Sequence, residues 1–169
     1  MRSNEGVEWG AHCLVVLSLL PAGASLSAGA LAEYHGIPAP YLAKTLQALA
    51  RAGLVSSTPG RGGGYRLARP ARTITLLDAV RAVEGDEPFF RCTEIRRRGP
   101  GRAPVRASPP VCAVAGAMWR AESAWQDELA GTSVADLAAE VGRTAAPVAV
   151  ARSIRWLGTR MSPASTGRR

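Results

Sequence analysis

The sequence predicts a mainly α-helical fold with one small β-hairpin, and three observations lead to this prediction. Apolar residues recur at helical spacing through most of the chain. Between two such segments, short β-prone stretches flank a glycine cluster, which is the pattern of a hairpin. A loop rich in Pro, Gly and Arg then leads into a long segment with an apolar stripe. At 169 residues, the chain is long enough to bury a core as one domain.

Three helices are expected in the first third of the chain. The first spans residues 5–20 and stops at the segment PAGAS. The second covers about Ser27–Tyr34, with Ser27 as its N-cap, and Gly36 supplies the left-handed turn that ends it. The third runs from about Pro40 to Ala52, and its core-facing residues recur at i, i+4 and i+7, namely Leu42, Leu46 and Leu49.

After the third helix, which Gly53 terminates, the period of the pattern changes. The segment LVSSTPGRGGGYRLARP predicts a two-stranded hairpin with a basic, glycine-rich tip. Two helices joined by a tight turn and followed by such a hairpin are the parts of a winged helix-turn-helix. A fourth helix is expected from about Ile74 to Gly85. The sequence therefore predicts a winged helix-turn-helix DNA-binding domain over residues 1–85.

The second half of the chain predicts a loop, a long helix and a closing helix. Residues 86–110 form the loop. The long helix begins with Ser108 as N-cap and Pro109 at the first helical position, and the segment TSVADLAAEVG forms the closing helix. Residues 111–143 are thus expected to be the dimerisation helix and the closing helix, and residues 144–169 a disordered tail. The apolar stripe of the long helix consists of Val114, Met118, Ala121 and Trp125.

The charge balance of the chain favours an anionic partner. Lys and Arg number 21 against 13 Asp and Glu, which gives a net charge of +8. Aromatic residues make up only 5% of the chain, so a protein that reads double-stranded DNA is favoured over a platform that stacks single-stranded bases. No constellation of acid, base and nucleophile indicates an enzyme, and an electron carrier would have no use for the hairpin. DNA binding is therefore the favoured class of function.

The stretch CLVVLSLL has the composition of the apolar part of a secretory signal. Glu5 and Glu8 precede it, however, whereas a signal has a positively charged start. No run of the sequence approaches the ~20 apolar residues that a membrane span needs. The expected location is therefore the cytoplasm, with no membrane partner.

The third helix is expected to enter the major groove, and the hairpin tip to contact phosphates or the minor groove. A glycine-rich tip allows the backbone to approach the duplex. The same glycines would fit a flexible loop or a phosphate-binding loop of an enzyme, but neither the Lys-Ser/Thr nor the helix of a Walker loop follows them. The expected DNA-binding residues lie in these two places, namely Pro40, Tyr41, Lys44, Thr45, Gln47, Arg61, Gly62 and Gly63.

Glu8 and His12 stand four residues apart in an otherwise apolar helix, so their side chains share one helix face. Such a pair is either a surface hydrogen bond or two donors of a metal site. Three cysteines do not make a disulfide scaffold, and Cys13 adjoins the apolar stripe and is expected to be buried. Cys92 and Cys112 leave three roles open, which are a metal cluster, a thiol–disulfide switch and a zinc site.

The segments PYLAKTLQALARAGLV, GRGGGYRLARP and ITLLDAV resemble the IscR/NsrR-type family of winged-helix regulators. The resemblance covers about Val7 to Val141. Members are bacterial dimeric repressors and activators that often carry an iron–sulfur cluster. The resemblance implies a homodimer built on the long helix, with recognition helices and wings on a palindromic operator of double-stranded DNA. Pro59 stands where some members have a wing arginine, so that role is assigned to Arg61.

Cluster-binding members commonly place three cysteines in the loop before the long helix, whereas this chain has only Cys92 and Cys112 there, with nineteen residues between them. One redox-sensing type of member holds a [2Fe–2S] cluster with two Cys, one His and one Glu. The matching positions here are Cys92, Cys112, His12 and Glu8, with ligands expected from both subunits. The resemblance therefore implies a redox sensor whose [2Fe–2S] cluster controls operator binding. In it, the place of Cys112 in the first turn of a helix would favour the thiolate.

Overall fold

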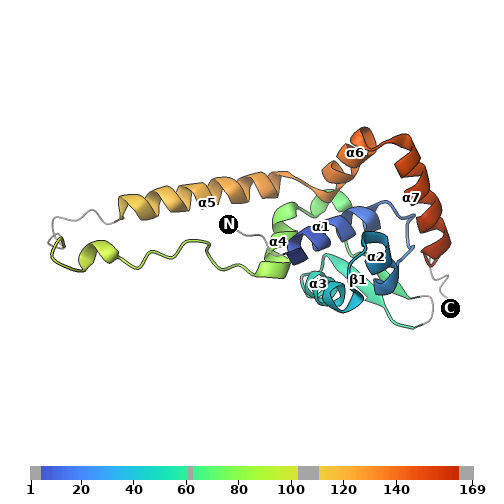
Figure 1. Cartoon of the computed structure of the whole chain (residues 1–169), viewed down its shortest axis with the longest axis horizontal. Coiled ribbons are helices and arrows are strands. Elements are labelled where there is room, and N and C mark those ends of the chain that lie inside the picture. Colours follow the sequence, from blue (N-terminus) through green and yellow to red (C-terminus); the bar gives the residue numbers. More distant parts are fainter. Residues whose placement is uncertain (1–4, 61–62, 103–110, 164–169) are drawn as a thin grey trace.

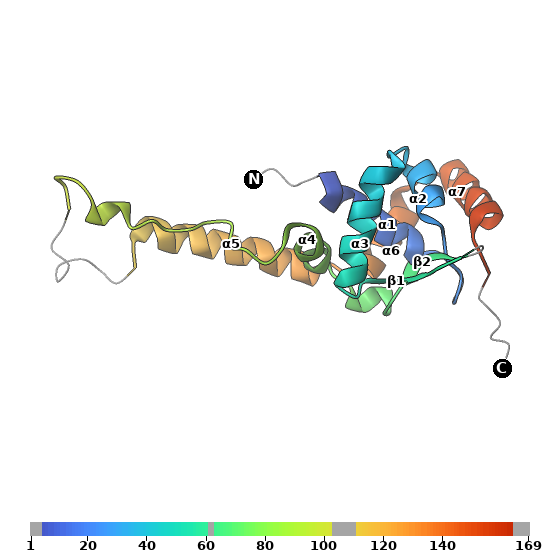
Figure 2. The same cartoon turned by 90° about the horizontal axis from the view of Figure 1, so that it is seen from below.

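The computed structural model describes residues 5–60, 63–102 and 111–163 of the chain. Most elements gather in a body, and an arm extends away from it (Figure 1). The arm consists of α5 and the segment before it, which runs alongside α5 in the opposite direction (Figures 1 and 2). The elements of the described residues are α1 Glu5–Ser18, α2 Ala28–His35, α3 Ala39–Arg51, β1 Val55–Thr58, β2 Gly64–Leu67, the 3-10 helix Ala71–Thr73, α4 Leu76–Glu84, the 3-10 helix Ile95–Arg97, α5 Ala113–Gly131, α6 Val134–Thr144 and α7 Pro147–Arg160.

Helix α1 forms the centre of the body, because it packs against α3, α4 and α6. Leu14 of α1 is fully buried. The leucines expected to face the core from α3 are also fully buried, which confirms that prediction for Leu42, Leu46 and Leu49. Burial of each of these side chains contributes about 1.5–3 kcal/mol to folding. The core therefore holds α3 firmly against α1.

The helix-turn-helix forms as the sequence predicts. Ser27 is the N-cap of α2, where its Oγ accepts a hydrogen bond from the Ala30 N–H at 3.1 Å. Gly36 ends the helix with φ 66°, in the left-handed region. The Ile37 N–H then donates to the Ala32 carbonyl at 2.9 Å. This tight turn sets the direction of α3 relative to α2.

The predicted hairpin is confirmed as well. Strands β1 and β2 pair in antiparallel fashion, with Thr58 opposite Gly64. A further segment joins the edge of the hairpin, since Leu26 and Tyr65 exchange backbone hydrogen bonds of 3.0 and 2.7 Å. Gly64 permits this approach, because a Cβ there would lie 2.5 Å from the Leu26 carbonyl oxygen. The hairpin, or wing, is thereby anchored to the segment that leads into α2.

Helix α5 begins later than the sequence predicts. It starts at Ala113, and Cys112 is its N-cap with an extended backbone. The predicted start, Ser108 and Pro109, lies outside the described residues. Val111 and Cys112 are described and are not helical, so the prediction of a helix through them is wrong. Cys112 takes the extended backbone of an N-cap, with φ −62° and ψ 132°, and its carbonyl accepts a hydrogen bond from the Gly116 N–H at 2.8 Å, so the helix begins after it.

Most of α5 is exposed in the single chain. Ala115 is its one buried residue, while Val114 and Trp119 are 65% and 45% exposed. The segment before α5 covers part of the helix, where the Phe89 N–H donates to Glu122 Oε1 at 2.7 Å. Neither α5 nor any other helix of the described chain is long and apolar enough to cross a membrane.

The expectation of a disordered tail over residues 144–169 is wrong, because α7 occupies most of this range. Helix α7 packs back on the body, where Tyr34 Oη of α2 donates to Ser153 Oγ at 2.9 Å. Leu157 of α7 is buried in the core. Helices α6 and α7 therefore complete the body that the first half of the chain begins (Figure 1).

Candidate nucleic-acid interface and metal centre

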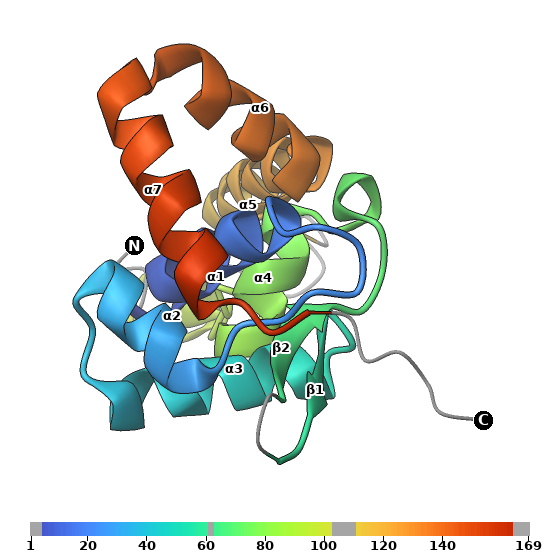
Figure 3. The same ribbon diagram turned by 90° about the vertical axis from the view of Figure 1, so that its right-hand side faces the viewer.

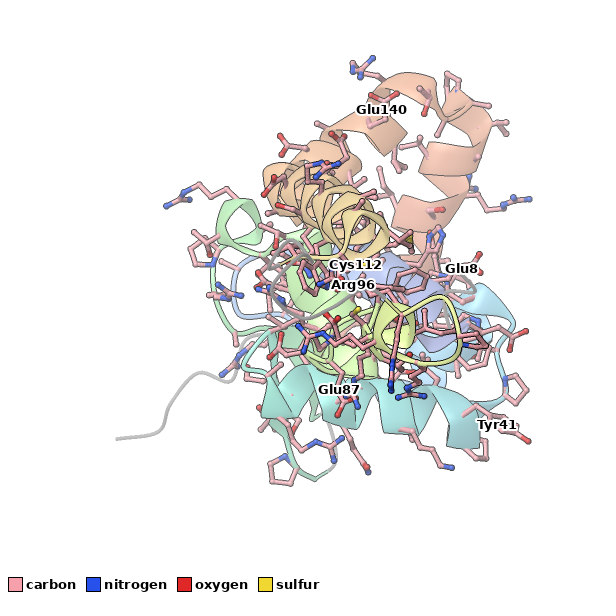
Figure 4. All side chains as sticks on the ribbon, turned by 90° about the vertical axis from the view of Figure 1, so that its left-hand side faces the viewer. Glu8, Tyr41, Glu87, Arg96, Cys112 and Glu140 are labelled. Carbon is pink, nitrogen blue, oxygen red and sulfur yellow. The ribbon has the colours of Figure 1, made fainter. Side chains whose placement is uncertain are left out.

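Helix α3 and the wing lie along one side of the body (Figure 3). Pro40, Tyr41, Lys44 and Gln47 are exposed on α3. Tyr41 lies near the start of the helix and is 60% exposed (Figure 4). These side chains offer a phenol, an ammonium and an amide, which are groups that contact phosphates and base edges in a DNA groove.

Thr45 does not belong to this exposed face, and the prediction that it does is wrong. The residue is only 5% exposed. It follows Leu42 by three positions and precedes Leu49 by four, so helical periodicity places it with the buried leucines. Its Cγ2 faces Gly10 of α1, where an added Cβ would lie 3.3 Å away. Thr45 therefore joins α3 to α1 instead of facing a duplex.

The tip of the wing is described only in part. Arg61 and Gly62 lie outside the described residues. The N–H of Gly63 donates to the Gly60 carbonyl at 3.0 Å. An added Cβ at Gly63 would lie 2.0 Å from the Thr58 carbonyl oxygen, so the turn itself requires glycine there. Folding of the turn is thus sufficient to explain this glycine.

Cys112 lies where a helix stabilises a thiolate. The backbone N–H groups of Ala115 and Val114 lower the pKa of the Cys112 thiol, and the positive charge of Arg96 lowers it further. Figure 4 views the molecule from the free end of the arm, where Cys112 and Arg96 are labelled. The preference for the thiolate is the one expected from the sequence, although Cys112 caps α5 and does not lie in its first turn as expected.

Arg96 links the two cysteines of the arm. Its Nε donates to Glu94 Oε2 at 3.0 Å, and Cys92 Sγ lies 3.9 Å from Glu94 Oε1. Glu94 is the main cause of the raised pKa of Arg96, and the charges of Cys112 and Cys92 add to it. The charges of both cysteines therefore act on one guanidinium in the arm.

Glu8 and His12 lie apart from these cysteines, exposed on α1 in the body. Helix α5 begins at the free end of the arm, away from α1 (Figures 1 and 2). Within the described part of one chain, no group of three or more His, Cys, Asp and Glu side chains gathers into a metal site. One chain therefore does not bring together the four predicted ligands, which are Glu8, His12, Cys92 and Cys112.

A second imidazole lies beside His12, and no spacing in the sequence indicates it. The ring centroids of His12 and His35 are 5.8 Å apart. Burial lowers the pKa of His35, and the charge of His12 lowers it further. The Nε2 atom of His35 is buried, without a hydrogen-bond partner among the described residues. His35 ends α2, so this contact arises only from the packing of α2 beside α1.

The cysteines are expected to differ in their reaction with iodoacetamide. Cys13 is fully buried, and burial raises its pKa to about 12, whereas the pKa of Cys112 is lowered. A lowered pKa leaves more of the reactive thiolate at neutral pH. Mass spectrometry of the folded, metal-free protein should find Cys112 alkylated and Cys13 unmodified, with the urea-unfolded protein as a control that exposes both. Equal modification of both thiols in the folded protein would refute this difference.

A comparison with protein families finds a match over residues 3–140. The matching family is Rrf2, described as an iron-dependent transcriptional regulator. The Bacillus subtilis protein YwgB, named as an HTH-type transcriptional regulator, is 37% identical over 91 residues, which are 54% of this chain and 58% of that protein. The match thus spans somewhat more than half of the length of this relative.

Two solved structures have a similar fold. CymR (YrzC), the global cysteine regulator of B. subtilis, has a TM-score of 0.66 at 24% identity, over 83% of this chain and 98% of that chain. IscR of T. potens has a TM-score of 0.63 at 22% identity, over 89% of this chain and 96% of that chain. These two likenesses show that the chain shares the fold of both regulators.

Proposed function

The chain belongs to the Rrf2 family of iron-dependent transcriptional regulators, and on that premise we propose a dimeric DNA-binding regulator whose [2Fe–2S] cluster state controls operator binding. Helix α3 enters the major groove of double-stranded DNA with Tyr41, Lys44 and Gln47, while the wing contacts the backbone. Two such domains related by a two-fold axis suit a palindromic operator.

The observation that carries the cluster proposal is the division of the donors between two places. Cys92 and Cys112 belong to the arm, where the charges of both act on Arg96, whereas Glu8 and His12 are exposed on the body. Each place offers two donors, and a [2Fe–2S] cluster takes two protein donors at each iron. An arm that reaches the body of a second copy therefore completes the set of four.

The donors fit this group chemically. The lowered pKa of Cys112 favours the thiolate that binds iron. Glu8 and His12 lie one turn apart on α1, so an oxygen and a nitrogen donor face the same side. When bound, the cluster supplies a one-electron change of charge at a potential that His ligation raises above that of all-thiolate ligation.

Helix α1 offers a direct route from Glu8 and His12 to the recognition helix. Gly10 lies between these two residues in the sequence. A Cβ added to Gly10 would lie 3.3 Å from Cγ2 of the buried Thr45 of α3, so the two helices are in close contact there. Lys44, the neighbour of Thr45, is exposed on the proposed DNA-binding face. A shift of α1 that follows a change of charge at Glu8 and His12 therefore displaces α3.

Anaerobic purification followed by visible absorption, iron analysis and sulfide analysis tests this function. We expect a coloured protein with about two irons and two sulfides per cluster. Operator binding in a mobility-shift assay is expected to differ between the oxidised protein and the dithionite-reduced protein. A protein that stays colourless after cluster reconstitution would rule out the cluster and leave DNA binding to be measured on its own.

Replacing Lys44 by Ala is expected to weaken operator binding about tenfold, because an exposed ammonium on α3 is lost. The slope of log affinity against log salt should fall by about one, as expected for one lost phosphate contact. Arg152→Ala is the matched control, since it removes an exposed positive charge from α7 instead. Equal affinity of Lys44→Ala and the wild type at moderate salt would argue against this contact.

A second function is favoured by the same arm. The charges of Cys92 and Cys112 act on one guanidinium, and the lowered pKa of Cys112 suits thiol–disulfide chemistry. Oxidation by hydrogen peroxide would join the two sulfur atoms, and the two electrons and two protons released would convert the peroxide to two waters. This function predicts a colourless protein whose operator affinity follows a reversible disulfide, and metal analysis separates it from a zinc-bound regulator.

A further inference from the structure

We propose that the cleft between α6 and α7 binds an uncharged, mainly apolar small molecule. The cleft has a volume of about 440 Å³, which lies in the usual range for small-molecule sites. Figure 3 faces the side of the body opposite the arm, where α6 and α7 diverge above α1. None of the residues that line the cleft belongs to α3, to the wing or to the arm.

Four elements enclose the cleft. The turn that follows α1 and the end of α2 form the floor, with Leu20 and Tyr34 among its residues. Helices α6 and α7 form the opposite walls, in which small residues leave the space open, namely Ala138, Gly142, Ala145, Ala149 and Gly158. A Cβ added to Gly142 or Gly158 meets no described atom within 4 Å. The space exists because these positions lack large side chains.

The lining defines the chemical class of the ligand. None of the lining residues is charged, and the larger side chains of the two helix walls are apolar, namely Val141, Val150, Ile154 and Leu157. The polar groups are the hydroxyls of Tyr34 and Ser153, and Tyr34 Oη donates to Ser153 Oγ at 2.9 Å. The Ser153 hydroxyl keeps its own proton for one acceptor on a ligand. A charged ligand would lose its hydration without compensation, so the site selects a neutral molecule with a carbonyl or ether oxygen.

The rim of the cleft exposes apolar side chains to solvent. Leu19, Val141 and Ile154 are 51%, 45% and 66% exposed. Apolar side chains that are exposed together at a concave surface are typical of a binding site. A bound apolar molecule would cover these side chains, and removal of this surface from water drives the binding.

The floor of the cleft belongs in part to the helix-turn-helix. The ring of Tyr34 lies 4.9 Å from that of His35, at the end of α2. Arg160 of α7 also pairs with Glu33 of α2 at 2.9 Å. A ligand between α6 and α7 therefore shifts the position of α2, and operator affinity is expected to change with it. This last step rests on the proposed DNA-binding function, whereas the binding itself does not.

Fluorescence titration with prodan, an uncharged naphthalene derivative with a carbonyl group, tests the site in the full chain without DNA. We expect saturable binding with a blue-shifted emission and one site per chain. Anilinonaphthalene sulfonate, an anion of similar size, should bind at least tenfold more weakly. Binding of prodan that does not saturate, or equal affinity for the anion, would overturn the proposal.

Matched substitutions locate the bound prodan. Gly158→Leu fills the cleft and is expected to lower prodan affinity at least tenfold, whereas Gly131→Leu at the end of α5 leaves it unchanged. Neither glycine has a described atom within 4 Å of an added Cβ, and leucine favours a helix over glycine, so both variants are expected to fold. Unchanged affinity in Gly158→Leu overturns the site.

A substitution in the other wall of the cleft tests the site if Gly158→Leu fails to fold. Gly142→Leu fills the cleft from α6 and carries the same expected loss. Tyr34→Phe removes the hydroxyl that orients Ser153 and is expected to weaken prodan binding about fivefold. A folded wild-type chain that binds no prodan overturns the proposal, and because no DNA is present, that result leaves the proposed regulator function standing.

Discussion

Replacing His12 by Ala is expected to abolish [2Fe–2S] binding, whereas replacing His35 by Ala leaves the cluster in place. The two ring centroids are only 5.8 Å apart, so this pair of variants separates a ligand from its neighbour. His12 is exposed on α1 beside Glu8, while Nε2 of His35 is buried. A metal centre that takes ligands from two copies of the chain needs an imidazole that the second copy can reach, and only that of His12 is exposed. Visible absorption and iron content per chain measure the result.

A second matched pair tests the carboxylate donor. Glu8→Ala is expected to lose the iron on gel filtration, because three protein donors do not complete a [2Fe–2S] cluster. Glu5→Ala removes another exposed carboxylate from the first turn of α1 and is expected to retain the iron. Retention of the iron in both His12→Ala and Glu8→Ala would disprove the mixed ligand set.

Replacing Gly64 by Ala is expected to lower the free energy of unfolding by about 2 kcal/mol and to weaken operator binding with it. The added Cβ would lie 2.5 Å from the carbonyl carbon and oxygen of Leu26, which are backbone atoms that cannot rotate away. The two hydrogen bonds between Leu26 and Tyr65, at 3.0 and 2.7 Å, form at this point. Loss of this contact separates the wing from the segment that leads into α2.

Urea unfolding measures this loss, with Gly131→Ala as the control. Gly131 ends α5, and an added Cβ there meets no described atom within 4 Å. Alanine at that position is expected to leave stability unchanged or to raise it by up to about 1 kcal/mol, since it favours the helix. Wild-type stability and operator affinity in Gly64→Ala would show that the wing does not approach Leu26 this closely.

The helix-turn-helix and the wing are predictable from the sequence because their determinants are local. Ser27 caps α2 and Gly36 ends it, and each acts on residues only a few positions away. The burial of Thr45 shows that residue type alone does not predict which side of α3 a residue occupies. A polar residue suggests an exposed position, but its spacing from Leu42 and Leu49 places it in the core.

The expectation of a disordered tail overlooks a helical pattern that the sequence contains. Pro147 stands at the first helical position, and Val150, Ile154 and Leu157 recur at i, i+4 and i+7. No side chain caps the start of α7. The last 29 residues also contain six Arg and no Asp or Glu, a composition typical of a basic tail. The contacts that hold α7 on the body join residues more than one hundred positions apart, which no local pattern shows.

For the candidate metal centre, the sequence identifies possible donors but not their arrangement. The i, i+4 spacing places Glu8 and His12 on one face of α1, as the structure does. The interaction of Cys92 and Cys112 with Arg96 depends on how the segment before α5 runs alongside the helix in the opposite direction. The contact of His12 with His35 depends in the same way on packing between helices.

A heterodimer of two defective chains tests most directly whether the cluster is shared between subunits. One chain carries Cys92→Ser and Cys112→Ser, and the other carries Glu8→Ala and His12→Ala. Neither homodimer retains all four donors, whereas the heterodimer, purified through two different affinity tags, retains one complete set between its chains. We expect colourless homodimers and a heterodimer with one [2Fe–2S] cluster, hence about two irons per dimer. A colourless heterodimer beside a coloured wild type would contradict a cluster held between two subunits.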